Sequence, residues 1–106
     1  MKHLAALLLI ATASLSLHAS EKDGQAVAAK YNCMGCHSVE QRIVGPAFRD
    51  VAIRYRDQNR DEVEKDLMHK VKTGTGGNWG SMIKMPAQQI KDNDLRIIIR
   101  WVLSQK

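Results

Sequence analysis

The chain has 106 residues, of which 44% are hydrophobic and five are aromatic, and its formal net charge is +5 at pH 7. This length allows one small domain and excludes a large multidomain enzyme. A domain of this size with so few aromatic residues builds only a marginal core by itself, so we expect a cofactor, a metal or a cross-link to complete it.

Residues 1–19 have the pattern of a secretory signal peptide. Lys2 supplies a positive charge, residues 4–17 are apolar-biased and uncharged, and Ala19 is a small residue at a suitable cleavage position. This apolar segment is shorter than the roughly 20 residues that a membrane-spanning helix needs. We therefore expect cleavage after Ala19, a mature domain of residues 20–106, export to the periplasm and no stable membrane insertion, with an uncleaved anchor as the alternative.

Residues 20–32 are expected to form the first helix. Their i, i+3, i+4, i+7 positions hold Gly24, Val27, Ala28 and Tyr31, which would lie on one face. Small residues on that face would allow a second helix to approach closely.

The most informative stretch of the chain is Cys33-Met34-Gly35-Cys36-His37. A C-x-x-C-H sequence is typical of the covalent attachment site of a c-type haem. On a helical turn both thiols and the imidazole would point the same way. The cysteines can then add to the two vinyl groups of one porphyrin, while the imidazole reaches the iron from the same side. We predict one covalent haem c, bound by Cys33 and Cys36, with His37 as an iron ligand.

Three other sites use the same residue types. A thioredoxin-like redox motif would need flanking strands, and the mature chain has no convincing strand pattern. A structural zinc site needs four ligands, but beyond these three residues only His69 remains outside the first nineteen. A disulfide between Cys33 and Cys36 would close almost no chain and would stabilise little.

The segment after His37 is expected to be a loop that ends near Gly45-Pro46. Such a loop can fold back beneath the histidine and offer a backbone carbonyl to its second ring nitrogen, which would orient the imidazole. An ordinary loop proline is the alternative. Val51, Ala52 and Tyr55 favour a short helix with a basic outer face. The arginines in and just before residues 48–60 are Arg42, Arg49, Arg54, Arg56 and Arg60.

A second clear helix is predicted over residues 61–73, capped by Asp61 and ended by Gly74. Its apolar positions, four residues apart, are Val63, Leu67 and Val71. His69 also falls on this helix, where a surface or packing role is expected in preference to metal binding.

Residues 73–85 form a glycine-rich segment around Trp79, followed by Met85-Pro86. Glycine allows close approach to a flat ligand, and the spacing fits no phosphate-binding motif. A methionine here could be a thioether ligand of iron, although methionine more often serves in packing. Met82 and Met85 are both candidates, and we favour Met85 because Pro86 restricts it to extended backbone.

The last helix has the clearest amphipathic pattern in the chain. Its apolar positions are Leu95, Ile98, Ile99, Val102 and Leu103, and Asp92 or Asn93 is the expected cap. We expect this helix to pack in the core against the first helix.

Taken together, these segments resemble the small bacterial class I cytochromes c of the cytochrome c-551 (c8) type. The resemblance spans residues 20–106 and rests on the Cys-Met-Gly-Cys-His motif, on Val-Gly-Pro-Ala-Phe at 44–48, on Trp-Gly at 79–80 before Met-Pro at 85–86, and on the ending Trp-Val-Leu-Ser-Gln-Lys.

The resemblance implies an all-α fold, with several helices wrapped around one covalently bound haem. It also implies that His37 and Met85 are the axial ligands, that the Pro46 carbonyl accepts a hydrogen bond from His37, and that the Trp79 indole donates to a haem propionate. The sequence departs from the family in two places. The loop between Trp79 and the methionine is one residue longer. The family often has an asparagine soon after the methionine that bonds its sulfur, whereas this sequence reads Pro86-Ala87-Gln88, with Gln88 as the candidate replacement.

Axial ligation by histidine and methionine raises the reduction potential and leaves no open position for substrate. We therefore expect a diffusible one-electron carrier between respiratory redox partners, and no enzymatic activity. The alternative is a haem-based ligand sensor or small peroxidase with a labile methionine.

The charge of the mature chain bears on its partners. Without Lys2 the chain keeps fifteen basic and eleven acidic residues, an excess of +4 before the haem propionates are counted. This excess favours redox partners with acidic docking surfaces. The family resemblance suggests a cytochrome bc1-type donor and a nitrite reductase, oxidase or peroxidase acceptor. We expect a monomer that binds no nucleic acid.

Overall fold

Four α-helices and one short 3₁₀ turn make up the regular structure of the described residues. The computed structural model describes residues 5–10, 19–80 and 83–106. Within these ranges there is no strand, and the only β-type pairings are two isolated bridges. The all-α expectation is therefore confirmed, and the elements are α1 (Ala19–Lys30), η2 (Cys33–Gly35), α2 (Phe48–Tyr55), α3 (Arg60–Thr73) and α4 (Asp92–Leu103).

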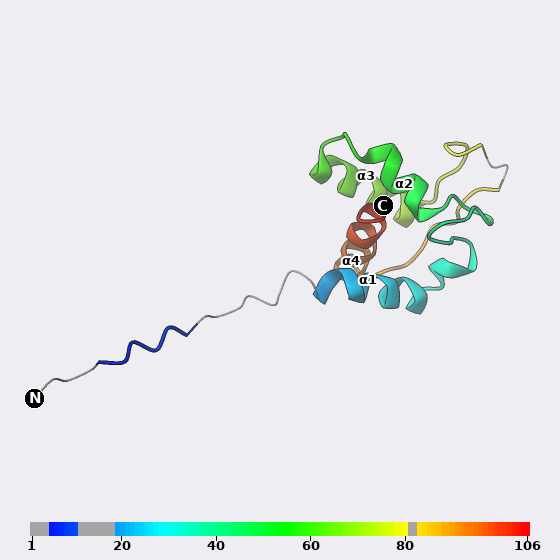
Figure 1. Cartoon of the computed structure of the whole chain (residues 1–106). Helices are drawn as coiled ribbons and strands as arrows, with labels where there is room; N and C mark the ends of the chain where they lie inside the picture. Colours follow the sequence, from blue (N-terminus) through cyan, green and yellow to red (C-terminus); the bar gives the residue numbers. More distant parts are fainter. Residues whose placement is uncertain (1–4, 11–18, 81–82) are drawn as a thin grey trace, which may run out of the picture.

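Helix α4 forms the centre of the core and packs against α1, α2 and α3. In Figure 1 it runs between α1 on one side and the α2–α3 pair on the other. Its most buried residue is Leu95, with 1% of its surface exposed. The predicted apolar face is confirmed, since all of its members are buried, and Trp101 joins them: Leu95, Ile98, Ile99, Trp101, Val102 and Leu103.

The close approach of α1 to α4 depends on Gly24. A Cβ atom added at Gly24 would lie 2.1 Å from the Cβ of Trp101, which no side chain could accommodate without a shift of the helices. Ala28, one turn further along α1, is completely buried. The prediction that small residues on this face admit a second helix is confirmed.

Helix ends differ in detail from the sequence-based expectation. The cap of α3 is Asn59, whose side-chain oxygen accepts a hydrogen bond from the backbone N–H of Glu62 at 3.1 Å, so the assignment of Asp61 was wrong by two residues. Lys91 precedes α4, which places Asp92 inside the first turn. There its carboxylate faces the positive end of the helix dipole instead of capping a backbone N–H.

Polar contacts also join the helices. The Glu64 carboxylate of α3 pairs with Arg96 Nε at 3.3 Å and Arg100 Nε at 3.1 Å, both on α4. Tyr31, just beyond α1, donates its hydroxyl hydrogen to Asp94 of α4 at 2.6 Å. These contacts fix α1 and α3 relative to the central helix.

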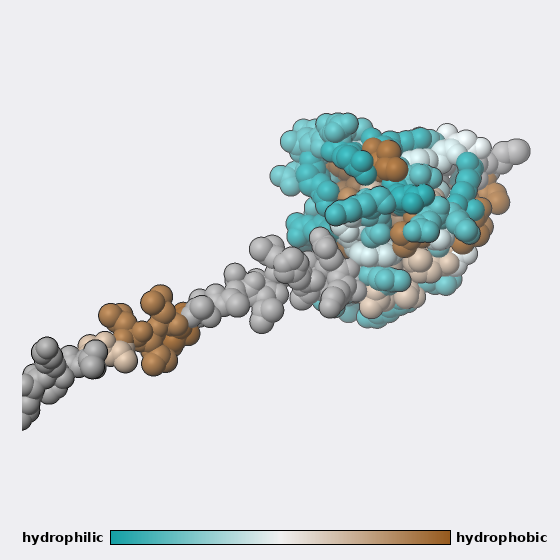
Figure 2. Space-filling model, viewed as in Figure 1, coloured by the Kyte–Doolittle hydropathy of each residue, from teal (hydrophilic) through white to brown (hydrophobic). Residues whose placement is uncertain are grey.

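The described part of the predicted signal peptide is residues 5–10. Its apolar side chains are exposed, with Leu7 at 89%, and they form the brown cluster at the lower left of Figure 2. The rest of the predicted leader before Ala19, residues 1–4 and 11–18, lies outside the described residues. Among the residues that were searched, no helix is both long and apolar enough to cross a membrane.

Candidate functional site

The Cys-x-x-Cys-His segment forms a single tight helical turn. The backbone N–H of Cys36 donates to the Cys33 carbonyl at 3.3 Å, and the N–H of His37 donates to the same carbonyl at 3.0 Å. Asn32, in the left-handed region with φ 59°, makes the bend between α1 and this turn. Asparagine tolerates that conformation better than most residues. The turn therefore has the i, i+3, i+4 arrangement that the motif requires.

Both cysteines are free thiols, and no disulfide joins them. Cys33 is half-buried and Cys36 is exposed. Burial raises the pKa of the Cys33 thiol above its ordinary value, because the thiolate would be poorly solvated there. The pair is therefore available for covalent attachment to a cofactor.

The loop that follows His37 folds back and contacts its imidazole ring. The chain folds back so that the N–H of Gly45 donates to the Cys36 carbonyl at 2.8 Å. This places the Pro46 carbonyl 2.8 Å from His37 Nδ1. A carbonyl only accepts hydrogen bonds, so Nδ1 must carry the proton and Nε2 is left as the nitrogen with a lone pair. The imidazole is thus prepared to coordinate a metal through Nε2.

Close packing fixes the plane of this imidazole. A Cβ atom at Gly45 would lie 2.4 Å from His37 Cε1, so only glycine fits against the ring. The Phe48 ring stacks on His37 with centroids 4.7 Å apart and an interplanar angle of 16°. Phe48 in turn meets Trp101 of α4 edge to face at 5.4 Å. The histidine is therefore connected to the hydrophobic core through two aromatic rings.

Met85 is anchored through its backbone. It pairs with Thr75 in an isolated antiparallel bridge, with N–H to carbonyl distances of 2.8 and 3.0 Å. At Gly74, φ is 84°, and an added Cβ would lie 3.0 Å from the Met85 carbonyl oxygen. The glycine-rich segment thus closes into a loop whose two ends are fixed at these residues. Met82, the other candidate methionine, lies outside the described residues.

Gln88 is engaged with the backbone around Met85. Its side-chain amide donates to the Pro86 carbonyl at 3.0 Å, and its N–H donates to the Val71 carbonyl at 2.9 Å. This glutamine therefore ties the methionine segment to the end of α3.

Trp79 lies in the loop between these anchors and is half-buried. The guanidinium carbon of Arg54 lies 3.3 Å from the centroid of its ring system, in a cation–π contact with α2. Figure 1 places this loop, in yellow, on the same side of the molecule as the cyan turn η2. His69 is exposed on α3, as expected for a surface residue.

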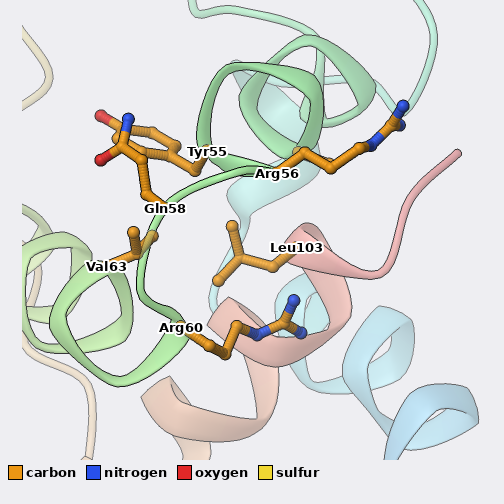
Figure 3. Close-up of a pocket in the computed structure, with 7 residues that line it drawn as sticks. Tyr55, Arg56, Gln58, Arg60, Val63 and Leu103 are labelled. Atoms are coloured by element: carbon orange, nitrogen blue, oxygen red, sulfur yellow. The ribbon is translucent and has the colours of Figure 1, made fainter.

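Two cavities lie elsewhere in the described structure. One of about 190 Å³ is bounded by α2, α3 and the end of α4, and a neighbouring one of about 170 Å³ shares part of its wall. Figure 3 shows Tyr55 and Gln58 pointing to one side of the larger cavity and Arg56 to the other, with Leu103 between them. None of the predicted haem residues lines either cavity.

The donor set of the site fits a haem and does not fit a metal ion bound by protein alone. In the part of the chain that the structure describes, no group of three or more His, Cys, Asp or Glu side chains could hold a metal. What the structure offers is two free thiols and an oriented imidazole on one turn, and a fixed methionine in a separate loop. A c-type haem takes two covalent attachments and two axial ligands from its protein, and these are the residue types that serve for them.

An all-helical fold with such a site defines a c-type haem protein. The family model for cytochrome c matches residues 21–106. Cytochrome c-551 of Pseudomonas aeruginosa is 36% identical over 107 residues, with all of both chains covered. Cytochrome c-552 of Hydrogenobacter thermophilus is 39% identical over 80 residues, covering 76% of this chain and 79% of that one.

Solved structures agree. Wild-type cytochrome c552 of Nitrosomonas europaea is 37% identical and superposes with a TM-score of 0.70 over 77% of this chain and 99% of that chain. The chain therefore belongs to the cytochrome c family, as a class I member of the c-551/c-552 type. It carries one covalent haem c and is an electron carrier, not an enzyme.

Sequence reasoning missed several residues that shape the site. Thr75 carries no pattern that would pair it with Met85, because a bridge of one residue on each side has no alternation to detect. Phe48 was noted only as part of the family resemblance, and its stacking on His37 depends on tertiary packing. Arg54 was counted among the surface charges, yet it contacts Trp79.

Proposed function

We propose that this protein is a diffusible periplasmic carrier of single electrons, with its haem attached to Cys33 and Cys36 and its iron bound by His37 and Met85. The observation that carries the proposal is the pairing of an imidazole, oriented by Pro46, with a methionine whose backbone is anchored to Thr75. When bound, the haem supplies a reversible one-electron couple. The protein supplies fixed axial ligands, so little must rearrange when the electron arrives or leaves.

Each residue has a distinct task in this proposal. Pro46 holds the His37 tautomer that leaves Nε2 for iron, and the hydrogen bond makes the imidazole a better donor. The Thr75 bridge and the restriction imposed by Pro86 keep Met85 presented from the loop. Trp79 donates its indole N–H to a haem propionate. Two axial side chains leave no site for substrate, which favours electron transfer over ligand sensing or peroxidase chemistry.

Location and partners follow from the leader and the charge. Cleavage after Ala19 would release a mature chain of residues 20–106 into an oxidising compartment. Its basic surface suits donors and acceptors with acidic docking surfaces, such as a cytochrome bc1-type complex and a nitrite reductase, oxidase or peroxidase. Binding of this kind is weak and fast, as repeated turnover between partners requires.

The test is production of the full chain in a bacterium that matures c-type cytochromes. We expect the intact mass of residues 20–106 plus one haem, and a reduced spectrum that carbon monoxide does not change at neutral pH. A mass that retains the leader in matured protein would contradict the location. Rapid carbon monoxide binding would contradict the carrier role and support a ligand sensor.

A further inference from the structure

Arg54, in the last turn of α2, makes two contacts with the loop that carries Trp79. Its guanidinium carbon lies 3.3 Å from the ring centroid of Trp79. Its Nη1 donates to the Asn78 carbonyl at 2.8 Å. Both contacts join α2 to a segment more than twenty positions further along the chain, and neither is part of the regular secondary structure.

Among the residues that the structure describes, no acidic side chain forms an ion pair with this guanidinium. Across the described ranges the ion pairs of arginine are those of Arg96 and Arg100 with Glu64, and none involves Arg54. An exposed arginine samples many rotamers, and two simultaneous contacts select one of them. The planar, delocalised guanidinium can stack on an indole while one of its N–H groups donates sideways, which a lysine ammonium cannot do.

The loop backbone does not fix Trp79 by itself. Gly77 and Gly80 flank it with φ of 83° and 69°, and an added Cβ would meet no atom within 4 Å at either position. The surrounding backbone is therefore permissive and loosely packed. The indole plane must be set by contacts of the side chain: Trp79 packs against the edge of the hydrophobic core, and the Arg54 guanidinium lies over its ring.

The same arginine is connected to Met85. Asn78, whose carbonyl accepts from Arg54, donates its side-chain amide to Thr75 Oγ1 at 3.0 Å. Thr75 is the bridge partner of Met85. A chain of three contacts therefore leads from α2 to the backbone of the proposed iron ligand.

We infer that Arg54 is a positioning residue, which holds the Trp79 indole in the orientation that lets its N–H reach a haem propionate and keeps one positive charge fixed beside it. This inference rests on the proposed role of Trp79. A cation over the face of an indole withdraws electron density from the ring and makes the N–H a stronger donor. Arg54 therefore acts on the haem environment through Trp79 as well as through its own charge.

The direction of the electrostatic effect follows from Coulomb's law. Oxidised haem carries one more positive charge than reduced haem, so a nearby cation destabilises the oxidised form and raises the reduction potential. Removal of the Arg54 charge should lower the potential. Arg54→Lys keeps the charge without the planar stack, so it separates the charge from the positioning.

The experiment uses the reduced holoprotein, which is diamagnetic, and measures hydrogen exchange of the indole N–H groups by NMR together with the reduction potential. The chain has two tryptophans, and the buried Trp101 serves as an internal reference. Arg56→Gln is the matched control. It removes an exposed arginine two residues away that makes no ion pair within the described structure.

We expect Arg54→Gln to speed exchange of the Trp79 N–H by roughly two- to fivefold, to leave Trp101 unchanged and to lower the potential. Arg54→Lys should speed the exchange to a similar extent while retaining more of the potential. The inference is overturned if Arg54→Gln matches Arg56→Gln in both measurements, or if Arg54→Lys matches the wild type in both. Rapid carbon monoxide binding by the reduced wild-type protein at neutral pH would contradict the proposed function instead, while the Trp79 exchange rates of the haem-bound variants would still decide whether Arg54 orients the indole.

Discussion

His37 is the residue whose surroundings are most completely determined. One ring nitrogen faces the Pro46 carbonyl, Gly45 packs against the ring edge, and Phe48 stacks on its face. The hydrogen bond sets the tautomer of the imidazole, and the contacts with Gly45 and Phe48 restrict the rotation of its ring. The result is a ligand whose tautomer and plane are set before any metal is bound, which limits reorganisation during electron transfer.

The identity of the second axial ligand can be tested at the same scale. Met85→Ala should remove the sulfur-to-iron absorption band at the red end of the oxidised spectrum and lower the reduction potential, because thioether ligation raises it. The anchored position of Met85 opposite Thr75 supports this assignment. Optical spectra and potentiometry of the purified variant are the measurements.

Met82→Ala is the control for this experiment, and it should leave the band intact. If Met82→Ala abolished the band and Met85→Ala did not, the longer loop would have moved the ligand by three residues. Our assignment of Met85 would then be wrong.

Among the helices, Glu64 provides the main polar link between α3 and α4. It is 9% exposed and pairs with both Arg96 and Arg100. Glu64→Gln removes the charge that both guanidinium groups contact, and we expect a loss of about 1–3 kcal/mol in the free energy of unfolding. Urea unfolding of the holoprotein at pH 7 measures it.

Asp66→Asn is the matched control on the same helix. Asp66 pairs with Lys70 one turn away, and its side chain is 49% exposed. Exposed pairs at this spacing contribute about 0.3–0.5 kcal/mol. An equal loss of unfolding free energy in the two variants would show that the burial of Glu64 and its two ion pairs to α4 add nothing to the stability that an exposed pair provides.

The hydrogen bond between Tyr31 and Asp94 predicts a dependence of stability on alkaline pH. Donation to the carboxylate raises the pKa of the Tyr31 hydroxyl above its ordinary value. The unfolded chain then loses this proton first as the pH rises, so the stabilisation is complete below about pH 10 and is lost above it.

Tyr31→Phe isolates this contribution. The difference in unfolding free energy between wild type and Tyr31→Phe should be present at pH 7 and should shrink as the pH rises past 10. Urea titrations over this range measure it, and other alkaline transitions cancel in the difference. A constant difference up to the highest pH would contradict the assigned role of the bond.

The sequence predicted those elements whose pattern is local. The predicted apolar positions of α4 are all confirmed, and so is the predicted end of α3 at Gly74. Both predictions depend on neighbouring residues, through the periodicity of a helix and through a glycine with positive φ. The cap of α3 was misassigned because Asn59 and Asp61 are both good capping residues, and only the backbone geometry decides between them. The helical turn that begins at Cys33 was predicted correctly for the same local reason.

What could not be predicted depends on contacts between distant segments. The stack of Arg54 on Trp79 joins residues 25 positions apart, and no spacing rule links an arginine on a helix to a tryptophan in a glycine-rich loop. The two ion pairs that Glu64 makes with Arg96 and Arg100 likewise form only because α3 packs against α4. Such contacts follow from the fold and not from the order of residues.

On the scale of the whole molecule, the basic residues fall into two groups. On α3 and α4, Lys70, Lys72, Arg96 and Arg100 make ion pairs. In the described ranges, no arginine of residues 42–60 makes an ion pair. The hydrophilic face in Figure 2 lies largely over α2 and α3. A group of arginines without an ion-pair partner therefore lies in the segment that begins beside His37.

This asymmetry predicts where a change of charge alters electron transfer. Arg42 is exposed and pairs through its backbone with His37, whereas Lys65 is exposed on α3, which contributes none of the proposed haem ligands. Arg42→Glu and Lys65→Glu change the net charge equally. With hexacyanoferrate(III), an anionic oxidant, Arg42→Glu should slow oxidation of the reduced protein by roughly three- to tenfold at low salt, and Lys65→Glu by less. Stopped-flow rates should converge near 1 M salt, where the Debye length is about 3 Å.

Equal slowing by the two variants would mean that net charge alone governs the encounter. Rates without any dependence on ionic strength would contradict electrostatic assistance altogether.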